Sequence, residues 1–176
     1  MPQAELRAAI AKVDAAVEAA SERAGDALTC RRGCARCCVA GLSVLPVEAA
    51  LISAVVRERA LPLPGTTTPG MCAFLDAHGD CAIYPARPVV CRTHGLALRT
   101  VPDPARTGAV PVLGDDIEVC RLNYTTRAPA PAEILDATRI LMLLVTVDRR
   151  YRARVGLPDD GSRVELAALA AELRAR

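Results

Sequence analysis

The sequence predicts a mainly α fold: a small helical domain of about four helices around an irregular cysteine-rich centre that binds metal. Three observations support this fold class. Of the 176 residues, 52% are hydrophobic but only 2% are aromatic, so the core must consist of Leu, Val, Ile and Ala, and alanine favours helix. Apolar residues recur at helical spacing near both ends of the chain. The eight cysteines lie between those ends, among prolines and glycines.

Two helices are expected in the N-terminal part. Residues 3–24 carry apolar side chains at spacings of four, three and four, namely Leu6, Ile10, Val13 and Val17. Gly25 is suited to end this helix. Residues 46–60 form the second expected helix, because Pro46 suits a first turn and Glu48 favours the positive end of the helix dipole.

The central part is expected to be irregular. Residues 30–41 read as a cysteine-rich loop, and residues 61–70 contain three prolines and two glycines, which predicts a second loop. Residues 71–93 predict turns and short extended pieces held by whatever the cysteines bind. Residues 96–120 are irregular too, with weak strand signals near VPVL and DIEV.

Two more helices are expected in the C-terminal part. Residues 131–154 predict a long helix whose buried side would contain Ile134, Leu135, Leu141, Leu144, Val145 and Tyr151. Residues 162–175 predict the last helix, which begins with a capping-box pattern at Ser162 and Glu165. Its apolar stripe is Leu166, Leu169 and Leu173. We expect residues 1–176 to form a single domain, with a cysteine core of residues 30–125 flanked by these helices.

Charge and hydropathy exclude several functions. The formal net charge of +2 is too small to argue for nucleic acid or for a membrane surface. The most apolar run, residues 140–147, is far shorter than the roughly 20 residues that span a bilayer. The N-terminus has no basic region followed by an apolar stretch, so a signal peptide is not predicted. A cytoplasmic location is therefore expected.

Disulfides, bound metal and thiol chemistry are the three possible uses of the cysteines, which are Cys30, Cys34, Cys37, Cys38, Cys72, Cys81, Cys91 and Cys120. Thiols stay reduced in the cytoplasm, where a dense cysteine pattern indicates metal or catalysis more often than disulfides. The first three have the spacing C-x3-C-x2-C, which lets one loop wrap around a metal centre. Thiolate ligands select zinc, Cu(I) or iron–sulfur clusters.

The number of cysteines leaves two arrangements open. Two zinc sites of four thiolates each would use all eight, whereas one cubic [4Fe-4S] cluster would use four. Adjacent side chains diverge, so Cys37 and Cys38 serve two centres, or two irons of one cluster, more easily than one zinc ion. His94, three residues after Cys91, is a possible substitute ligand, and His78 in the turn DAHGD is expected to be exposed.

Two stretches carry a resemblance to a known family. CRRGCARCC and MCAFLDAHGDCAIYPARPVVCR resemble the CxxCxxCC (YkgJ-type) family of small cysteine-cluster, zinc- or iron-chelating domains. The resemblance covers about residues 30–125 and includes Glu48 in the helix between the two stretches. It implies that all eight cysteines are metal ligands. The first loop departs from the family pattern, with C-x3-C in place of C-x2-C, and this departure affects Cys30.

Four further residues are expected to surround the ligands: Arg87, Arg92, Tyr84 and His94. Tyr84, together with Ile83, would pack over the centre and limit the access of water. The two arginines would pair with thiolate charge, with Asp76 or with Asp80.

The function expected from these patterns is a metal-binding module that holds an iron–sulfur cluster or Zn²⁺, with a protein partner that the sequence does not identify. A metal-dependent enzyme is the alternative, because a related domain occurs in flagellin lysine methylases and because a cluster supports redox chemistry. The chain has no P-loop, no GxGxxG and no evident Ser/His/Asp set, and its catalytic residues are unknown. An interaction or metal-delivery protein is the third possibility.

Overall fold

The computed structural model describes residues 2–31, 33–65, 68–101, 112–113 and 116–175. Within them the chain forms five α-helices: α1 (Pro2–Ala24), α2 (Pro46–Glu58), α3 (Val89–Thr93), α4 (Ala137–Val155) and α5 (Leu166–Arg174). Three 3-10 turns are η1 (Gly25–Ala27), η2 (Tyr84–Ala86) and η3 (Pro131–Glu133). The strands are β1 (Ser43–Val44), β2 (Leu98–Arg99), β3 (Val112–Leu113), β4 (Ile117–Glu118), β5 (Leu135–Asp136) and β6 (Val164–Glu165).

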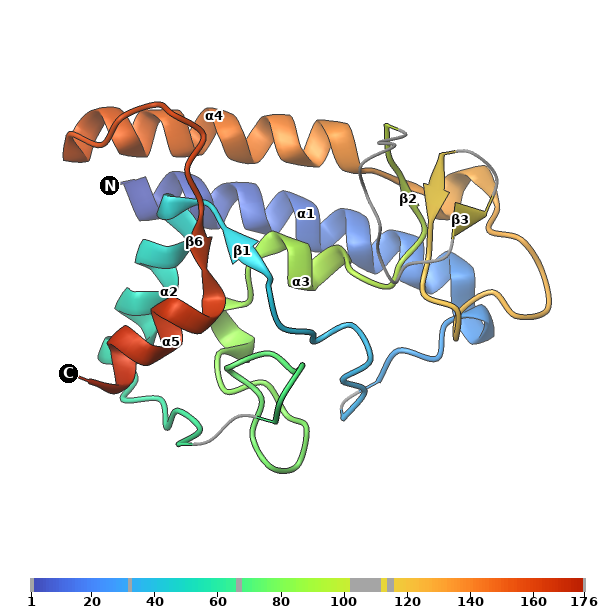
Figure 1. Ribbon diagram of the computed structural model, residues 1–176. Coiled ribbons are helices and arrows are strands. Elements are labelled where there is room, and N and C mark those ends of the chain that lie inside the picture. The colour runs from blue at the N-terminus through green and yellow to red at the C-terminus, as the bar shows by residue number, and fades with distance from the viewer. Residues whose placement is uncertain (1, 32, 66–67, 102–111, 114–115, 176) are drawn as a thin grey trace.

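The long helices build the main core. α1 and α4 lie side by side along most of their lengths, and α2 packs against both of them, with α5 on the other side of α2 (Figure 1). Their facing side chains are almost fully buried, as in Leu6, Ile52, Leu144 and Leu169. The expected helical architecture is therefore present. The loops that contain most of the cysteines lie below α1 in the view of Figure 1, around α3.

The strands form two small sheets in addition to the helices. β1 and β6 pair antiparallel, with Val44 opposite Val164, so the start of α5 lies against the loop before α2. The second sheet has the order β3-β4-β2-β5, in which only the β2–β5 pair is parallel, with Leu98 opposite Leu135. The strand signal in DIEV corresponds to β4. The signal in VPVL is only partly covered, because residues 110 and 111 lie outside the described residues.

The expected N-terminal elements are confirmed. α1 spans the predicted helix, and α2 begins at Pro46 as expected and ends two residues early at Glu58. The described parts of residues 61–70 are irregular. Residues 71–93 contain turns and isolated bridges, as expected, and also the short helix α3, which was not expected.

The expected helix over residues 131–154 begins too early. Residues 131–136 form η3 and β5 instead, because Leu135 donates its backbone N–H to the carbonyl of Ala97 and pairs with β2. α4 begins at Ala137, with the Asp136 carboxylate accepting a hydrogen bond from the backbone of Arg139. Leu141 was expected to be buried but is 50% exposed, since the buried side of α4 runs through Leu144, Val147, Asp148 and Arg152.

The capping box expected for the last helix is also wrong. Glu165 belongs to β6, and the first residue of α5 is Leu166, which no side chain caps. The hydroxyl of Ser162 instead accepts a hydrogen bond from Arg152. The apolar stripe is confirmed at Leu166 and Leu169, both of which are buried. No helix among the described residues is long and apolar enough to cross a membrane.

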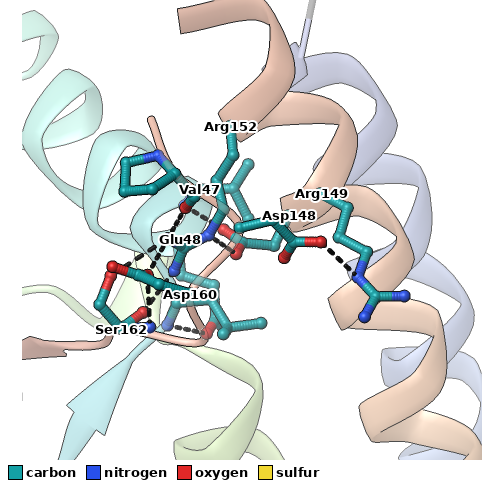
Figure 2. A network of polar contacts seen from close by, with 10 residues as sticks. Val47, Glu48, Asp148, Arg149, Arg152, Asp160 and Ser162 are labelled. Atoms are coloured by element: carbon teal, nitrogen blue, oxygen red, sulfur yellow. Dashed lines mark hydrogen bonds and ion pairs between the residues drawn. The ribbon is translucent and has the colours of Figure 1, made fainter. Parts of the chain in front are cut away.

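A buried ion pair fixes the chain between α4 and β6. The Asp148 carboxylate accepts hydrogen bonds from the backbone N–H of Val47, at 3.0 Å, and from Nε of Arg152, at 2.6 Å (Figure 2). The other guanidinium nitrogens of Arg152 donate to the segment that follows α4, at the Pro158 carbonyl, the Asp160 carboxylate and Ser162. Arg152 is only 2% exposed. This network joins α4, the start of α2 and the approach to α5.

Candidate metal centre

One cavity brings most of the cysteines together. Its volume is about 600 Å³, and seven of the eight thiols line it: Cys30, Cys34, Cys37, Cys38, Cys72, Cys81 and Cys91. None of the eight cysteines forms a disulfide; all are free thiols. Cys120 does not line the cavity, but its side chain lies beside that of Cys30, close to Gly95. Residues more than 60 positions apart in sequence thus gather at one place.

Backbone pairing brings the first cysteine loop against the second. The N–H of Cys72 donates to the carbonyl of Cys38 at 3.0 Å, and Val39 forms an antiparallel bridge with Met71. A second bridge, between Leu75 and Cys81, closes the hairpin-like turn that follows. Main-chain hydrogen bonds and bridges therefore set the relative positions of Cys38, Cys72 and Cys81.

The side chains between these cysteines anchor the loops in the main core. Phe74, Ile83 and Val89 are each at most 2% exposed and pack with residues of α1 and α2. The apolar side chains of this segment thus point into the core, while the neighbouring thiols line the cavity. The position of each thiol is therefore coupled to apolar burial.

Glu48 positions the segment that carries Cys91. Its carboxylate accepts a hydrogen bond from the N–H of Leu45, at 3.1 Å, and another from the N–H of Val89, at 2.9 Å. Glu48 is 4% exposed, and this burial raises its pKa, which the two hydrogen bonds counteract. One side chain in the first turn of α2 thus ties down the first turn of α3, two residues before Cys91.

Asn123 joins Cys30 to the Cys120 turn. Its Nδ2 donates to the sulfur of Cys30 at 3.3 Å and to the carbonyl of Gly95 at 2.7 Å. Its Oδ1 accepts from the backbone N–H and from the hydroxyl of Thr29. The N–H of Cys120 donates to the same Gly95 carbonyl. Asn123 is 4% exposed, so these hydrogen bonds hold the ends of two distant loops in a buried setting.

Sequence reasoning missed both Asn123 and Gly95. Gly95 has a φ of +92°, and a Cβ there would lie 3.6 Å from the Cys30 sulfur and 3.6 Å from the Cys120 Cβ. The only signals were local: an asparagine three residues after Cys120, and a glycine directly after His94. Neither pattern identifies its distant partner.

The thiols differ in their electrostatic setting. A hydrogen bond with the Cys38 thiol lowers the pKa of Cys37 to about 6, and the positive charge of Arg87 contributes in the same direction. The same hydrogen bond, together with burial, raises the pKa of Cys38. Burial, together with the neighbouring thiols of Cys72 and Cys81, raises the pKa of Cys91 to about 12. The raised pKa values of Cys38 and Cys91 favour the protonated thiols until a cation displaces their protons.

Arg87 and Tyr84 lie at the mouth of the cavity. The Arg87 guanidinium stacks on the Tyr84 ring, 3.9 Å from its centroid, and its charge also lowers the pKa of Cys81 against the effect of burial, which raises it. Tyr84 was expected to cover the centre but is 59% exposed. Ile83, which was also expected to pack over the centre, is 2% exposed, lines the cavity and packs into the main core.

Arg92 has a different partner from those expected. It lines the cavity, but its Nη1 binds both carboxylate oxygens of Asp14 on α1, at 2.6 and 2.8 Å, and its Nε donates to the Arg87 carbonyl. Asp76 instead accepts the backbone N–H groups of His78 and Asp80, which shapes the turn there. Arg92 therefore fastens the cysteine region to α1.

The two histidines lie in different surroundings. His94 follows α3 and lines the same cavity as the seven cysteines. His78 is exposed, as expected.

The thiols fit the chemistry of a soft metal, although they do not converge on one point. Among the described residues, no group of three His, Cys, Asp or Glu side chains is arranged closely enough to hold a metal ion. The cavity wall nevertheless presents seven thiols with arginine close by, and thiolate is the ligand that zinc and iron–sulfur clusters prefer. By the chemistry of its donor set, the site suits either zinc or clustered iron.

The comparison with family models agrees with this donor set. The model described as "CxxCxxCC: Putative zinc- or iron-chelating domain" matches residues 29–127, which is more than half of the chain. The matched region contains all eight cysteines, Asn123 and Arg87. No curated protein and no solved structure matches the chain significantly. The chain therefore belongs to the CxxCxxCC family.

Proposed function

We propose that this protein is a metal-binding module that holds iron, in sulfur-bridged clusters, on the thiolates lining its central cavity. The observation that carries the proposal is the gathering of seven cysteines from two distant segments around one space of about 600 Å³. The free thiols are supplied by loops that main-chain hydrogen bonds already hold together.

The size of the cavity favours an iron–sulfur cluster over zinc alone. A closed zinc site needs only four sulfurs at about 2.3 Å from one ion. The thiols here surround a space many times larger than one ion, and no three of the described ligand-type side chains converge on a point. A multi-iron centre fills space between its thiolates with bridging sulfide. Zinc remains the alternative metal because its ligands are the same.

The surrounding residues support a charged sulfur centre. Arg87 brings a guanidinium near Cys37 and Cys81, where it offsets thiolate charge. Asn123 donates an N–H to the Cys30 sulfur, and hydrogen bonds to ligating sulfur help to set cluster potential. When bound, a cluster supplies one-electron redox capacity, and the chain's residues orient and shield it.

Metal analysis of the purified protein tests this proposal. The protein is purified without oxygen, and iron, zinc and acid-labile sulfide are measured per chain together with a visible absorption spectrum. Equal amounts of iron and sulfide with a broad visible band support the iron–sulfur proposal. Zinc without sulfide or colour replaces it with zinc sites. A protein that carries neither metal, after reconstitution has also been attempted, contradicts metal binding altogether.

A further inference from the structure

We propose that the eight cysteines form two separate four-thiolate centres, which lie side by side. The first centre consists of Cys30, Cys34, Cys37 and Cys120, and the second of Cys38, Cys72, Cys81 and Cys91. This inference rests on the proposed function, since it assigns ligands to the metal that the function requires. It applies whether the bound metal is clustered iron or zinc.

The backbone defines the second centre. The hydrogen bond from Cys72 to the Cys38 carbonyl places these two residues on adjacent chain segments. The bridge between Leu75 and Cys81 brings the third cysteine back beside them. The fourth, Cys91, lines the same cavity as these three, and the hydrogen bond from Val89 to the buried Glu48 carboxylate fixes the chain two residues before it.

Asn123 and Gly95 define the first centre. The Asn123 amide holds the Cys30 sulfur at 3.3 Å, and both Cys30 and Cys120 border the space above Gly95, where a Cβ would lie 3.6 Å from each side chain. Cys34 and Cys37 lie on the same short loop as Cys30, at the spacing C-x3-C-x2-C, and line the cavity together with it. Cys120 therefore joins the first loop although it lies outside the cavity lined by the other seven.

The adjacent pair marks the boundary between the centres. Neighbouring residues in an extended or turning chain point their side chains in different directions, so Cys37 and Cys38 reach different centres more easily than the same ion. The main chain separates the two residues in the same way, because the Cys38 carbonyl accepts the N–H of Cys72, whereas Cys37 continues the C-x3-C-x2-C spacing of the first centre. Because the two thiols still share a hydrogen bond, the two centres are neighbours.

Paired substitutions test the assignment with the number of lost thiols held constant. Cys81→Ser/Cys91→Ser removes two ligands from the second centre only, whereas Cys81→Ser/Cys120→Ser removes one from each. We expect the first variant to keep about half of the metal of the unsubstituted protein and the second to keep almost none, because each centre needs four thiolates. Equal metal content in the two variants overturns the proposal. Full metal content in Cys30→Ser/Cys120→Ser overturns it as well.

A second measurement needs no variant and therefore holds even where a substitution prevents folding. The native metal-loaded protein is treated with iodoacetamide, and labelled cysteines are identified by mass spectrometry. Two centres protect all eight thiols, whereas a single four-thiolate centre leaves about four reactive. Labelling confined to Cys30, Cys34, Cys37 and Cys120 contradicts the first centre. If the unsubstituted protein contains no metal, the proposed function itself is contradicted. Failure of the function is thereby distinguished from failure of the two-centre assignment, in which metal is bound but the labelling pattern differs.

Discussion

The helical part of the molecule and its cysteine-rich part are stabilised in different ways. In the helical part, side chains such as Leu6, Ile52 and Leu144 lose almost all exposure to water, and apolar burial supplies the folding energy. In the cysteine-rich part, seven of the eight cysteines are half-buried and Cys30 is exposed, and the loops are joined by main-chain hydrogen bonds and by a few buried side chains such as Phe74. We therefore expect the helices to form without metal and the loops to depend on it.

Metal removal is the change with the largest expected effect, because a structural metal site contributes on the order of 10 kcal/mol to the folding of the segment around it. We expect chelation to open the loops of residues 30–42 and 68–97 while α1, α2 and α4 keep their helical signal. Limited proteolysis followed by mass spectrometry locates the cuts, and far-UV circular dichroism follows the helices. Loss of the whole helical signal on chelation contradicts the division into two parts.

Phe74 tests the link between the two parts. It is fully buried in the main core, yet it stands between Cys72 and Cys81 in sequence. We expect Phe74→Ala to lower the free energy of unfolding by about 3–5 kcal/mol, because it leaves a cavity, and to weaken metal binding. Urea unfolding and metal titration measure the two effects. The matched control is Tyr84→Ala, at the exposed mouth of the cavity, for which we expect less than about 1 kcal/mol. Similar costs for both aromatics contradict the packing described here.

Arg152 tests the helical part alone. Arg152→Ala leaves the buried Asp148 carboxylate without its ion-pair partner, so we expect a loss of about 3–5 kcal/mol in the free energy of unfolding. The neighbouring control is Arg149→Ala, which breaks an exposed pair with Asp159 and is expected to cost less than about 1 kcal/mol. Metal content is expected to stay unchanged in both folded variants. Metal loss in folded Arg152→Ala protein indicates that the two parts are coupled more strongly than we infer.

Asn123 tests the cysteine-rich part alone and has the smallest expected effect on stability. Asn123→Ala removes the hydrogen bond to the Cys30 sulfur and leaves a buried backbone carbonyl at Gly95 with one partner fewer. We expect a cost of about 1–3 kcal/mol and faster alkylation of Cys30. Thr125→Ala, two residues away and exposed, is the control and is expected to leave both quantities unchanged. An unchanged alkylation rate in Asn123→Ala contradicts the positioning role.

The fold was predictable where the pattern is local. The four-residue spacing from Leu6 to Ile10 gives the buried face of α1, and Pro46 marks the start of α2. The start of α4 was not predictable, because the helical propensity of residues 131–136 is overridden by pairing of Leu135 with a strand almost 40 residues earlier.

In the candidate site, too, the local features were predictable from the sequence and the long-range contacts were not. The cysteine spacing predicts thiol ligands from sequence alone, since residue type and proximity along the chain carry the signal. The ion pair between Arg92 and Asp14 joins residues 78 positions apart, and the hydrogen bond from Asn123 to Cys30 spans 93. Contacts of this kind depend on how the loops close over α1, and a local pattern contains no information on that closure.

The most direct test of the central claim is X-ray absorption at the metal edge of the protein purified without oxygen. If cysteine thiolates hold the metal, the spectrum shows a shell of about four sulfur neighbours at about 2.3 Å, with iron neighbours beyond it when the metal is clustered. A shell made mainly of nitrogen or oxygen at about 2.0–2.2 Å contradicts the claim, because the cysteines would then not be the ligands.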